Sequence, residues 1–431
     1  MTLSLFWLAC KPVVPPTAPD EELHVLWGDL HAHTNLSHDG CERPDLSCSP
    51  AEALPGQHFF AEAEARGLAF AALTDHAEVS AWSTAGAPSI DAWGHTLALV
   101  AAAEPLEVLP LAGYEWTGRY PTTGDRSDWR GGHRTVVFES PTPCAAARVP
   151  GPTPAPRKPD SSEAYTLRAD GANNPMEMEA RLRAAMASEP CDSRALSWFH
   201  HPATQRPPGV DWSHDANHID TDLLVEILSE HGAFECHDPA DDGCDWRLPA
   251  HHDPRGSVRR ALAASLRLGF VGGTDAHDAR PGSLDDGGGA VADPGARAGT
   301  SHPYAGGLTG VFVHGELSRG SLFDALEARA TIASSFPLRG LRIDARDVRG
   351  QLFLPGAVVP EASWPLNVVV HHDDPRVTET TVELIVDGVL ETSGTSLAIA
   401  RPRTAAYLRI RLDLDGNEER AFVSPWFVES T

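Results

Sequence analysis

Short apolar runs alternate with helix-like stretches from about residue 23 to residue 333. The runs are nearly continuous, which is typical of strands buried on both faces of a parallel sheet. The predicted strands are 23–30, 68–73, 108–114, 135–138, 195–199, 223–228, 268–272 and 310–313. The predicted helices are 51–65, 91–103, 175–187, 257–268 and 318–330. Seven or eight such repeats over about 300 residues predict a (β/α) barrel rather than an open sheet.

The pattern changes after about residue 339. Short alternating stretches follow one another, separated by turn pairs such as Asp387-Gly388, and no helical periodicity is visible. This pattern predicts a small C-terminal all-β sandwich. We therefore divide the chain into an N-terminal stretch 1–22, a barrel 23–338 and a β-sandwich 339–431.

The N-terminal stretch combines a short apolar run, a cysteine and a Pro-rich spacer. The run ends at Ala9-Cys10, which is typical of a bacterial lipoprotein signal whose cysteine carries the lipid. We expect an exported periplasmic or cell-envelope protein with a lipid anchor at Cys10. No later segment has the roughly 18 apolar residues that a transmembrane span needs.

Six further cysteines form an even set, and two pairs of them are close in sequence within loop-like segments. Local pairing is the simplest arrangement: Cys41–Cys48, Cys236–Cys244 and, by elimination, Cys144–Cys191. Metal ligation is the alternative, but none of the cysteines shows C-x-x-C spacing. The set therefore favours disulfides and an oxidising compartment.

Charge excludes two classes of partner. The chain has 34 Lys and Arg against 60 Asp and Glu, a formal net charge of −26. Such a surface repels nucleic acid and anionic lipid. A small anionic substrate remains compatible, because bound divalent cations would dominate the field locally.

The ends of the predicted strands carry the residues that could bind a metal or take part in catalysis. His31 and His33 follow the first strand in "GDLHAHTNLSHDG", and Asp275 and His277 repeat that spacing in "GGTDAHDARPG". Residues at i and i+2 of a strand point to the same face, and the carboxyl ends of barrel strands meet at one face. Further His, Asp and Glu at strand ends are Asp75, His76, Glu115, His133, His200 and His201. Imidazoles and carboxylates gathered in this way predict a metal site.

The motifs "DLHAHTNLSHDG", "TDHAE" and "GTDAH" resemble the signatures of the PHP (polymerase and histidinol phosphatase) family of metal-dependent hydrolases. The resemblance covers roughly residues 23 to 333. It implies a distorted (β/α)7-type barrel holding two or three divalent ions, typically Zn, Mn or Fe. The export signal and the β-rich C-terminal part resemble the branch that includes carbamate- and ester-cleaving members.

Carried over residue by residue, the resemblance implies three sets of metal ligands, of which Glu115 bridges the first two. The sets are His31, His33, Glu115 and Asp275; Glu115, His133 and His201; and Asp39, His76 and His277.

Two ligand positions leave a choice. The motif "SHDG" offers His38 and Asp39, and we choose Asp39 because it precedes the glycine. The motif "FHHP" offers His200 and His201, and we choose His201 because the family has His before Pro. His200 is then a candidate substrate ligand or proton donor.

Three charged residues near these ligands suggest supporting roles. Arg134, beside His133, and Arg280, shortly after His277, are candidates for holding an anionic substrate. Glu226 lies inside an apolar run and is expected to orient an imidazole from behind. The alternative for Glu226 is a buried carboxylate paired with an arginine.

The predicted chemistry follows from the metals. Two neighbouring cations would lower the pKa of a bridging water towards about 7, and the resulting hydroxide would attack a small-molecule ester. The cations would also neutralise the oxyanion that develops. The sequence therefore predicts a metal-dependent phosphoesterase. The alternatives are a hydrolase of carboxylic esters, amides or carbamates, and a non-enzymatic envelope binding protein with a vestigial barrel. No sequence feature indicates the oligomeric state.

Overall fold

The structure is a computed structural model that describes most of the chain. The described residues are 23–37, 56–77, 81–82, 90–117, 132–144, 147–149, 153–154, 165–166, 172, 175–188, 193–204, 209–212, 223–236, 238, 240, 243–249, 252–284, 304–414 and 416–429. The predicted signal with Cys10, the His38/Asp39 choice and the Cys41–Cys48 pair lie outside these residues. So does Cys191.

All the predicted helices are present in shorter form. They are α1 (Phe59–Ala65), α2 (Ala92–Ala103), α3 (Pro175–Met186), α5 (Val258–Ala263) and α6 (Arg319–Glu327), with the 3-10 turns η4 (Pro254–Gly256) and η5 (Glu361–Ser363). Helix α6 begins after Ser318, whose hydroxyl accepts a hydrogen bond from the Ser321 N–H in a capping box. Helix α5 ends before its predicted end at residue 268, since Ser265 has a left-handed φ of 67°.

Strands occur at every predicted position. In the first part of the chain they are β1 (Leu23–Ala32), β2 (Phe70–Leu73), β3 (Ala81–Trp82), β4 (Ile90–Asp91), β5 (Leu109–Thr117), β6 (His133–Phe138), β7 (Thr153–Pro154), β8 (Tyr165–Thr166), β9 (Ala195–His200), β10 (Leu224–Ser229), β11 (Gly232–Ala233), β12 (Gly269–Gly272), β13 (Leu308–His314) and β14 (Thr331–Ser334). After the predicted boundary at residue 338 they are β15 (Arg342–Arg346), β16 (Val358–Val359), β17 (Leu366–His371), β18 (Val377–Val386), β19 (Val389–Ser393), β20 (Ser396–Ile399), β21 (Ala405–Leu414), β22 (Asn417–Val423) and β23 (Trp426–Val428).

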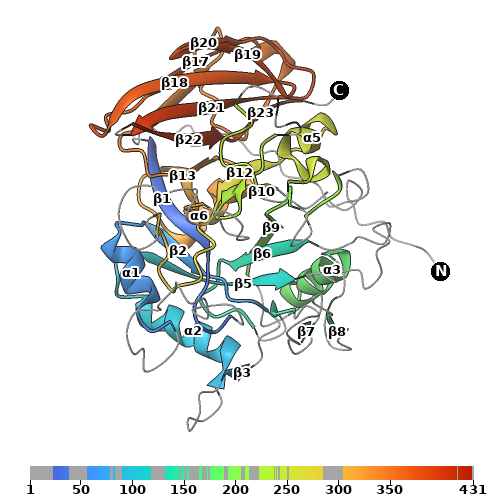
Figure 1. Ribbon diagram of the computed structural model, residues 1–431, viewed down its shortest axis with the longest axis vertical. Helices are drawn as coiled ribbons and strands as arrows, with labels where there is room; N and C mark the ends of the chain where they lie inside the picture. The colour runs from blue at the N-terminus through green and yellow to red at the C-terminus, as the bar shows by residue number, and fades with distance from the viewer. Residues whose placement is uncertain are drawn as a thin grey trace, which may run out of the picture.

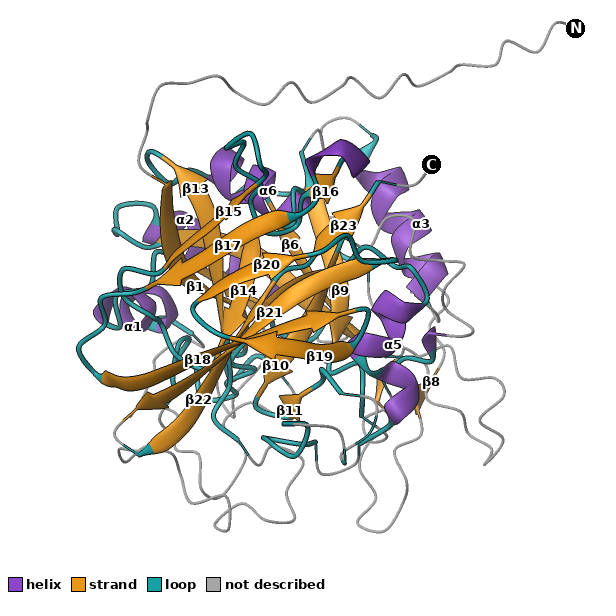
Figure 2. Ribbon diagram, turned by 90° about the horizontal axis from the view of Figure 1, so that it is seen from above, coloured by secondary structure: helices purple, strands orange, loops and turns teal. Residues whose placement is uncertain are grey.

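The main sheet is mixed rather than parallel, which corrects the sequence prediction. Strands β1, β2 and β5 run parallel, as do β9, β10 and β12, but β6 is antiparallel to both β5 and β9, and β13 is antiparallel to β1. An apolar pattern reports the burial of a strand and not its direction, so the sequence could not distinguish these cases. Figure 2 shows helices lying around the outside of the strands.

The same sheet continues into the C-terminal part of the chain. The main path of the sheet has the strand order β11-β10-β9-β6-β5-β2-β1-β13-β14-β22-β21-β18-β19, and β12 pairs with β10 beside this path. Strands β1 and β12 are not paired with each other; Ala276, after β12, makes a single bridge to Ala32 of β1, so the described strands show no closed barrel. Strand β14 pairs with β22 across the predicted boundary at residue 338. A separate sheet contains β15, β17 and β20. In Figure 1 these C-terminal strands lie at one end of the molecule, with α1 and α2 towards the other. The architecture is therefore mixed α/β and mostly sheet.

The structure also tests the predicted disulfides and the predicted turn at Asp387-Gly388. Cys236 and Cys244 form the predicted disulfide, and Cys144 is also disulfide-bonded. Asp387 and Gly388 both have positive φ and form the two-residue turn between β18 and β19. Among the described residues, no helix is long and apolar enough to span a membrane.

Candidate metal centre

The end of β1 is joined by hydrogen bonds to the segment after β12, which also carries predicted ligands. The His33 N–H donates to the Ala276 carbonyl at 2.8 Å, and the Asp275 N–H donates to the His31 carbonyl at 2.8 Å. Gly273 allows this close approach, because a Cβ there would lie 2.5 Å from the Cβ of His31. The segment after β12 therefore runs alongside the end of β1, and both i, i+2 pairs face one buried basin.

The first group of side chains in this basin surrounds the carboxylate of Asp275. The His33 Nε2 lies 3.2 Å from Asp275 Oδ1 and 3.1 Å from Glu115 Oε2. The His31 Nε2 lies 3.3 Å from Glu115 Oε2 and 3.6 Å from Asp275 Oδ1. The structure therefore brings together the four residues of the first predicted ligand set, all of them buried.

The second predicted set is brought together as well. Ligand atoms of Glu115, His133 and His201 lie within 4.8 Å of one another. The His133 Nδ1 is hydrogen-bonded to Glu115 Oε1. His201 comes directly after β9 and has a left-handed φ of 35°, as Asp275 does at 55°. Non-glycine residues in this region are uncommon and are often found at functional sites.

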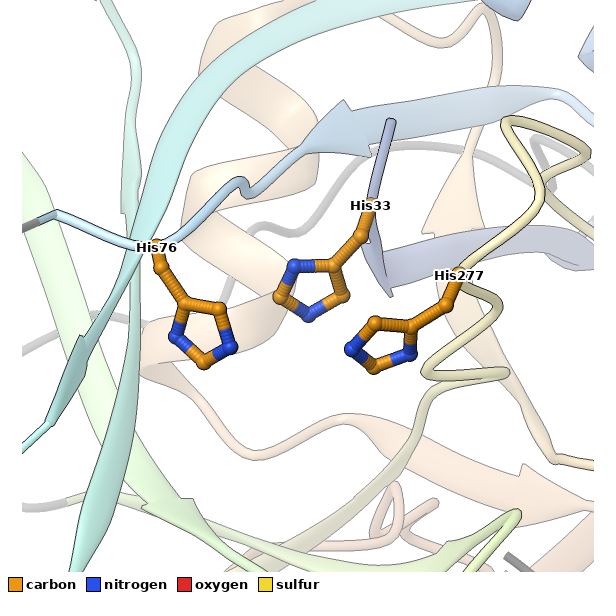
Figure 3. Close-up of side chains that lie close together, drawn as sticks. All are labelled: His33, His76 and His277. Carbon is orange, nitrogen blue, oxygen red and sulfur yellow. The ribbon is translucent and has the colours of Figure 1, made fainter. Parts of the chain in front are cut away.

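Two members of the third predicted set are grouped with His33. Figure 3 shows His33, His76 and His277 with their rings turned towards one another, and their ligand nitrogens lie within 4.8 Å. The rings of His33 and His277 are stacked with centroids 4.3 Å apart. Asp39, the remaining predicted member, lies outside the described residues.

Hydrogen bonds at Nδ1 fix the tautomer of most of these imidazoles. Glu226 lies between two rings, with its oxygens 3.0 Å from the His31 Nδ1 and 2.5 Å from the His200 Nδ1. This contact confirms the predicted orienting position of Glu226. Three other rings are held in the same manner: His33 by Ser37, His201 by Thr204 and His277 by the Asp275 carbonyl. When Nδ1 carries the proton, Nε2 presents its lone pair to the basin, as a metal-binding imidazole requires.

The electrostatics of the basin favour ionised carboxylates. Burial disfavours the charged form of Glu115, but His76 and His133 outweigh it and hold the pKa of Glu115 well below its usual value. Burial and the neighbouring His200 and His133 together hold the pKa of His201 well below its usual value. Ionised carboxylates beside a neutral imidazole are the donor forms that bind a cation.

Unsatisfied atoms provide a test of whether these residues fit a metal ion. Among the described residues, neither carboxylate oxygen of Asp275 has a partner at hydrogen-bond geometry, and the same holds for the Nε2 of His201. The Nε2 atoms of His31 and His33 lie 3.1 Å apart, so two lone pairs would face each other when both rings carry their proton on Nδ1. Divalent cations bound in the basin would satisfy these atoms, and imidazole with carboxylate is a suitable donor set for Zn, Mn or Fe.

The predicted arginines occupy different places. Arg134 follows His133 on β6 and therefore points to the opposite face of the sheet. There its guanidinium donates to Glu179 at 2.8 Å and lies 3.9 Å above the ring of Phe199. The structure does not bring Arg134 to the basin. Arg280 acts electrostatically on Asp278. Burial raises the pKa of Asp278 above its ordinary value, and Arg280 offsets only part of this increase.

His200 and His231 both face the basin. The His200 Nε2 lies 3.3 Å from Asp275 Oδ2, so His200 is grouped with the ligand candidates of the first set. The sequence analysis missed His231, whose Nε2 lies 3.1 Å from the same oxygen. Its place in the turn shortly after the predicted strand 223–228 was the signal that could have identified it.

Comparison with known proteins adds one similar structure. No protein-family model matches the chain, and no curated protein matches it. A solved structure of a two-domain protein from Bacteroides vulgatus ATCC 8482, containing a predicted PHP-like metal-dependent phosphoesterase, matches 95% of this chain and 97% of its own. The identity is 14% and the TM-score is 0.42.

Proposed function

We propose that the chain is a divalent metal-dependent hydrolase that cleaves a phosphoester of a small molecule. The observation that carries this proposal is the set of buried imidazoles whose Nδ1 atoms are engaged from behind and whose Nε2 atoms face the carboxylates of Glu115 and Asp275. Such an arrangement would destabilise an ordinary protein core, because buried acceptor atoms would face one another without a cation between them.

The proposed ligands are the predicted ones, with the described residues supplying most of them. His31, His33, Glu115, Asp275, His133, His201, His76 and His277 would hold two or three ions of Zn, Mn or Fe, together with Asp39. When bound, such ions supply hydroxide at neutral pH and stabilise the charge that develops on the substrate oxygen. The protein's own part is to hold its imidazoles in one tautomer, by Glu226, Ser37 and Thr204, and to exclude water from around them.

A second candidate is hydrolysis of a carboxylic ester, amide or carbamate. The observation that favours it is the position of Arg134, which is engaged by Glu179 on the far side of β6 and leaves one fewer cation for an anionic substrate. A non-enzymatic binding protein with a vestigial site is disfavoured, because the described ligand positions are intact and converge.

A substrate panel separates these candidates. Purified protein is assayed on nitrophenyl phosphate, a bis(nitrophenyl) phosphate diester and nitrophenyl carboxylic esters, beside His31→Ala and the exposed control His371→Ala. We expect turnover of a phosphoester by the wild type and by His371→Ala, and none by His31→Ala. Turnover of carboxylic esters alone would favour the second candidate, and equal activity of His31→Ala would contradict both.

Export is a separate proposal. The Cys236–Cys244 disulfide supports an oxidising compartment, and a lipid anchor at Cys10 would place the protein at the cell envelope. Labelling of whole cells with a radioactive fatty acid, compared between wild type and Cys10→Ser, tests the anchor.

A further inference from the structure

His231 lies in a tightly held turn between β10 and β11. Its backbone N–H donates to the Ser229 hydroxyl, and the carbonyl of the preceding Glu230 accepts from the Tyr304 N–H at 3.1 Å. Gly232 follows with φ of 130°, and a Cβ at that position would lie 2.4 Å from the Arg247 carbonyl oxygen. The turn is therefore fixed on several sides, and the imidazole of His231 has a defined place.

That place is against the carboxylate of Asp275. The two oxygens of Asp275 serve different neighbours: Oδ1 lies 3.2 Å from the His33 Nε2 and 3.6 Å from the His31 Nε2. On the other side, Oδ2 lies 3.1 Å from the His231 Nε2 and 3.3 Å from the His200 Nε2. One carboxylate thus separates two pairs of imidazoles.

The ring of His201 lies beside His200 and His231, the two imidazoles that face Asp275 Oδ2. Its centroid lies 4.8 Å from that of His231 and 4.0 Å from that of His200, and ligand nitrogens of the three residues lie within 4.8 Å of one another. Glu226 engages the Nδ1 of His200, and Thr204 engages that of His201. The Nε2 of His201 is fully buried and has no hydrogen-bond partner among the described residues.

We propose that His200, His201 and His231 form one metal position, and that Asp275 bridges it through Oδ2 to the ion bound by His31 and His33. This inference rests on the proposed function, in that it assumes a metal in the basin. It differs from the predicted ligand sets, in which Glu115 and His133 share the ion of His201. An imidazole nitrogen has one lone pair and binds one ion, so His201 cannot serve both arrangements at once.

The donor atoms of this position predict which metal ion it prefers. Three imidazole nitrogens and one carboxylate oxygen form a four-ligand set that suits Zn²⁺. Mg²⁺ and Ca²⁺ prefer oxygen ligands and are expected to bind poorly.

Metal stoichiometry tests the assignment without reference to activity. Metal-free wild type, His231→Ala and the exposed control His371→Ala are dialysed against Zn²⁺ and their zinc content is measured. We expect His231→Ala to hold one equivalent less than the wild type and His371→Ala to hold the full content. With Co²⁺ in place of Zn²⁺, the visible absorption of His231→Ala should fall correspondingly.

Two outcomes overturn different claims. Full zinc content in His231→Ala would overturn this assignment and leave the proposed function standing. A wild type that binds no zinc, manganese or iron would overturn the proposed function itself. Near-ultraviolet circular dichroism checks the fold of each variant, and His231→Gln, which keeps a polar side chain of similar size, replaces His231→Ala if the latter is unfolded.

Discussion

At the scale of single residues, Glu226 determines how two of the candidate ligands present themselves. One carboxylate accepts from the Nδ1–H of both His31 and His200, which come from different strands. Burial disfavours the charged form of Glu226, but the neighbouring His200 and His31 hold its pKa below the usual value. Glu226 is therefore a positioning residue, and its carboxylate must be ionised so that each oxygen can accept a hydrogen bond from one of the two imidazoles.

Substitution of Glu226 by Gln tests this role. The amide can accept from one Nδ1–H but turns its own N–H groups towards the other, so one imidazole loses its orientation. We expect Zn²⁺ binding to weaken about 10- to 100-fold, the range typical of changes behind metal ligands. Competition with a chromophoric chelator measures the affinity, and the exposed Glu391→Gln serves as control. Unchanged affinity in Glu226→Gln would show that its carboxylate does not orient the ligands.

Single residues also show what the sequence could and could not predict. The i, i+2 spacing of His31 and His33 was sufficient to place both rings in one basin. The same period of two places Arg134 opposite His133, so its absence from the basin follows from strand geometry. The position of His231 against Asp275 depends on how β10 and β12 pair, which the sequence does not encode locally.

At the scale of elements, the segment that begins at the β10–β11 turn links the basin to the C-terminal strands. His231 faces the basin, and four residues later the buried Glu235 accepts hydrogen bonds from three side chains. These are Arg259 at 2.9 Å, Arg409 at 3.0 Å and Tyr407 at 2.5 Å. Two of the three come from β21, so C-terminal strands hold the segment that carries His231.

Replacement of Glu235 by Ala is expected to destabilise the fold strongly. It would leave the guanidinium groups of Arg259 and Arg409 buried without their shared carboxylate. Loss of one member of such a buried network costs about 3–5 kcal/mol in the free energy of unfolding. Urea denaturation followed by tryptophan fluorescence measures the change, with the exposed Glu391→Ala as control. A loss no larger than that of Glu391→Ala would contradict the proposed stabilising role of Glu235.

The same network predicts a dependence on pH. Burial raises the pKa of Glu235, but Arg259 and Arg409 outweigh it and hold the pKa below the ordinary value of 4.5. Below about pH 4.5 the unfolded chain therefore binds a proton that the folded chain does not, and the folded state loses stability. We expect the stability difference between wild type and Glu235→Ala to be constant near pH 7 and to shrink as the pH falls below 4.5. Urea titrations at several pH values would reveal a constant difference if this interpretation were wrong.

At the scale of the whole molecule, the sheet connects the parts that the sequence analysis separates. The positions of the strands and helices follow from the apolar pattern, since that pattern reports burial. Their directions and the pairing of β14 with β22 do not, because they depend on contacts between distant segments. The largest core cluster likewise combines Val311 and Leu322 with Leu384 and Trp426 from the C-terminal strands.

Truncation after residue 338 tests the predicted boundary. Removal of residues 339–431 would expose the edge of β14 and the apolar residues that pack against the C-terminal strands. We expect the truncated chain to aggregate or to lack a cooperative unfolding transition. A soluble truncated chain with a sharp thermal transition would show instead that the first part folds independently.

The central claim is that the buried basin binds divalent metal and uses it for hydrolysis. The most direct measurement follows phosphoester hydrolysis by chelator-stripped wild-type protein as Zn²⁺, Mn²⁺ or Fe²⁺ is added back, with bound metal determined on the same samples. We predict negligible activity in the stripped protein and a rate that rises with bound metal until the basin is full. Full activity in protein shown to contain no metal would contradict the claim.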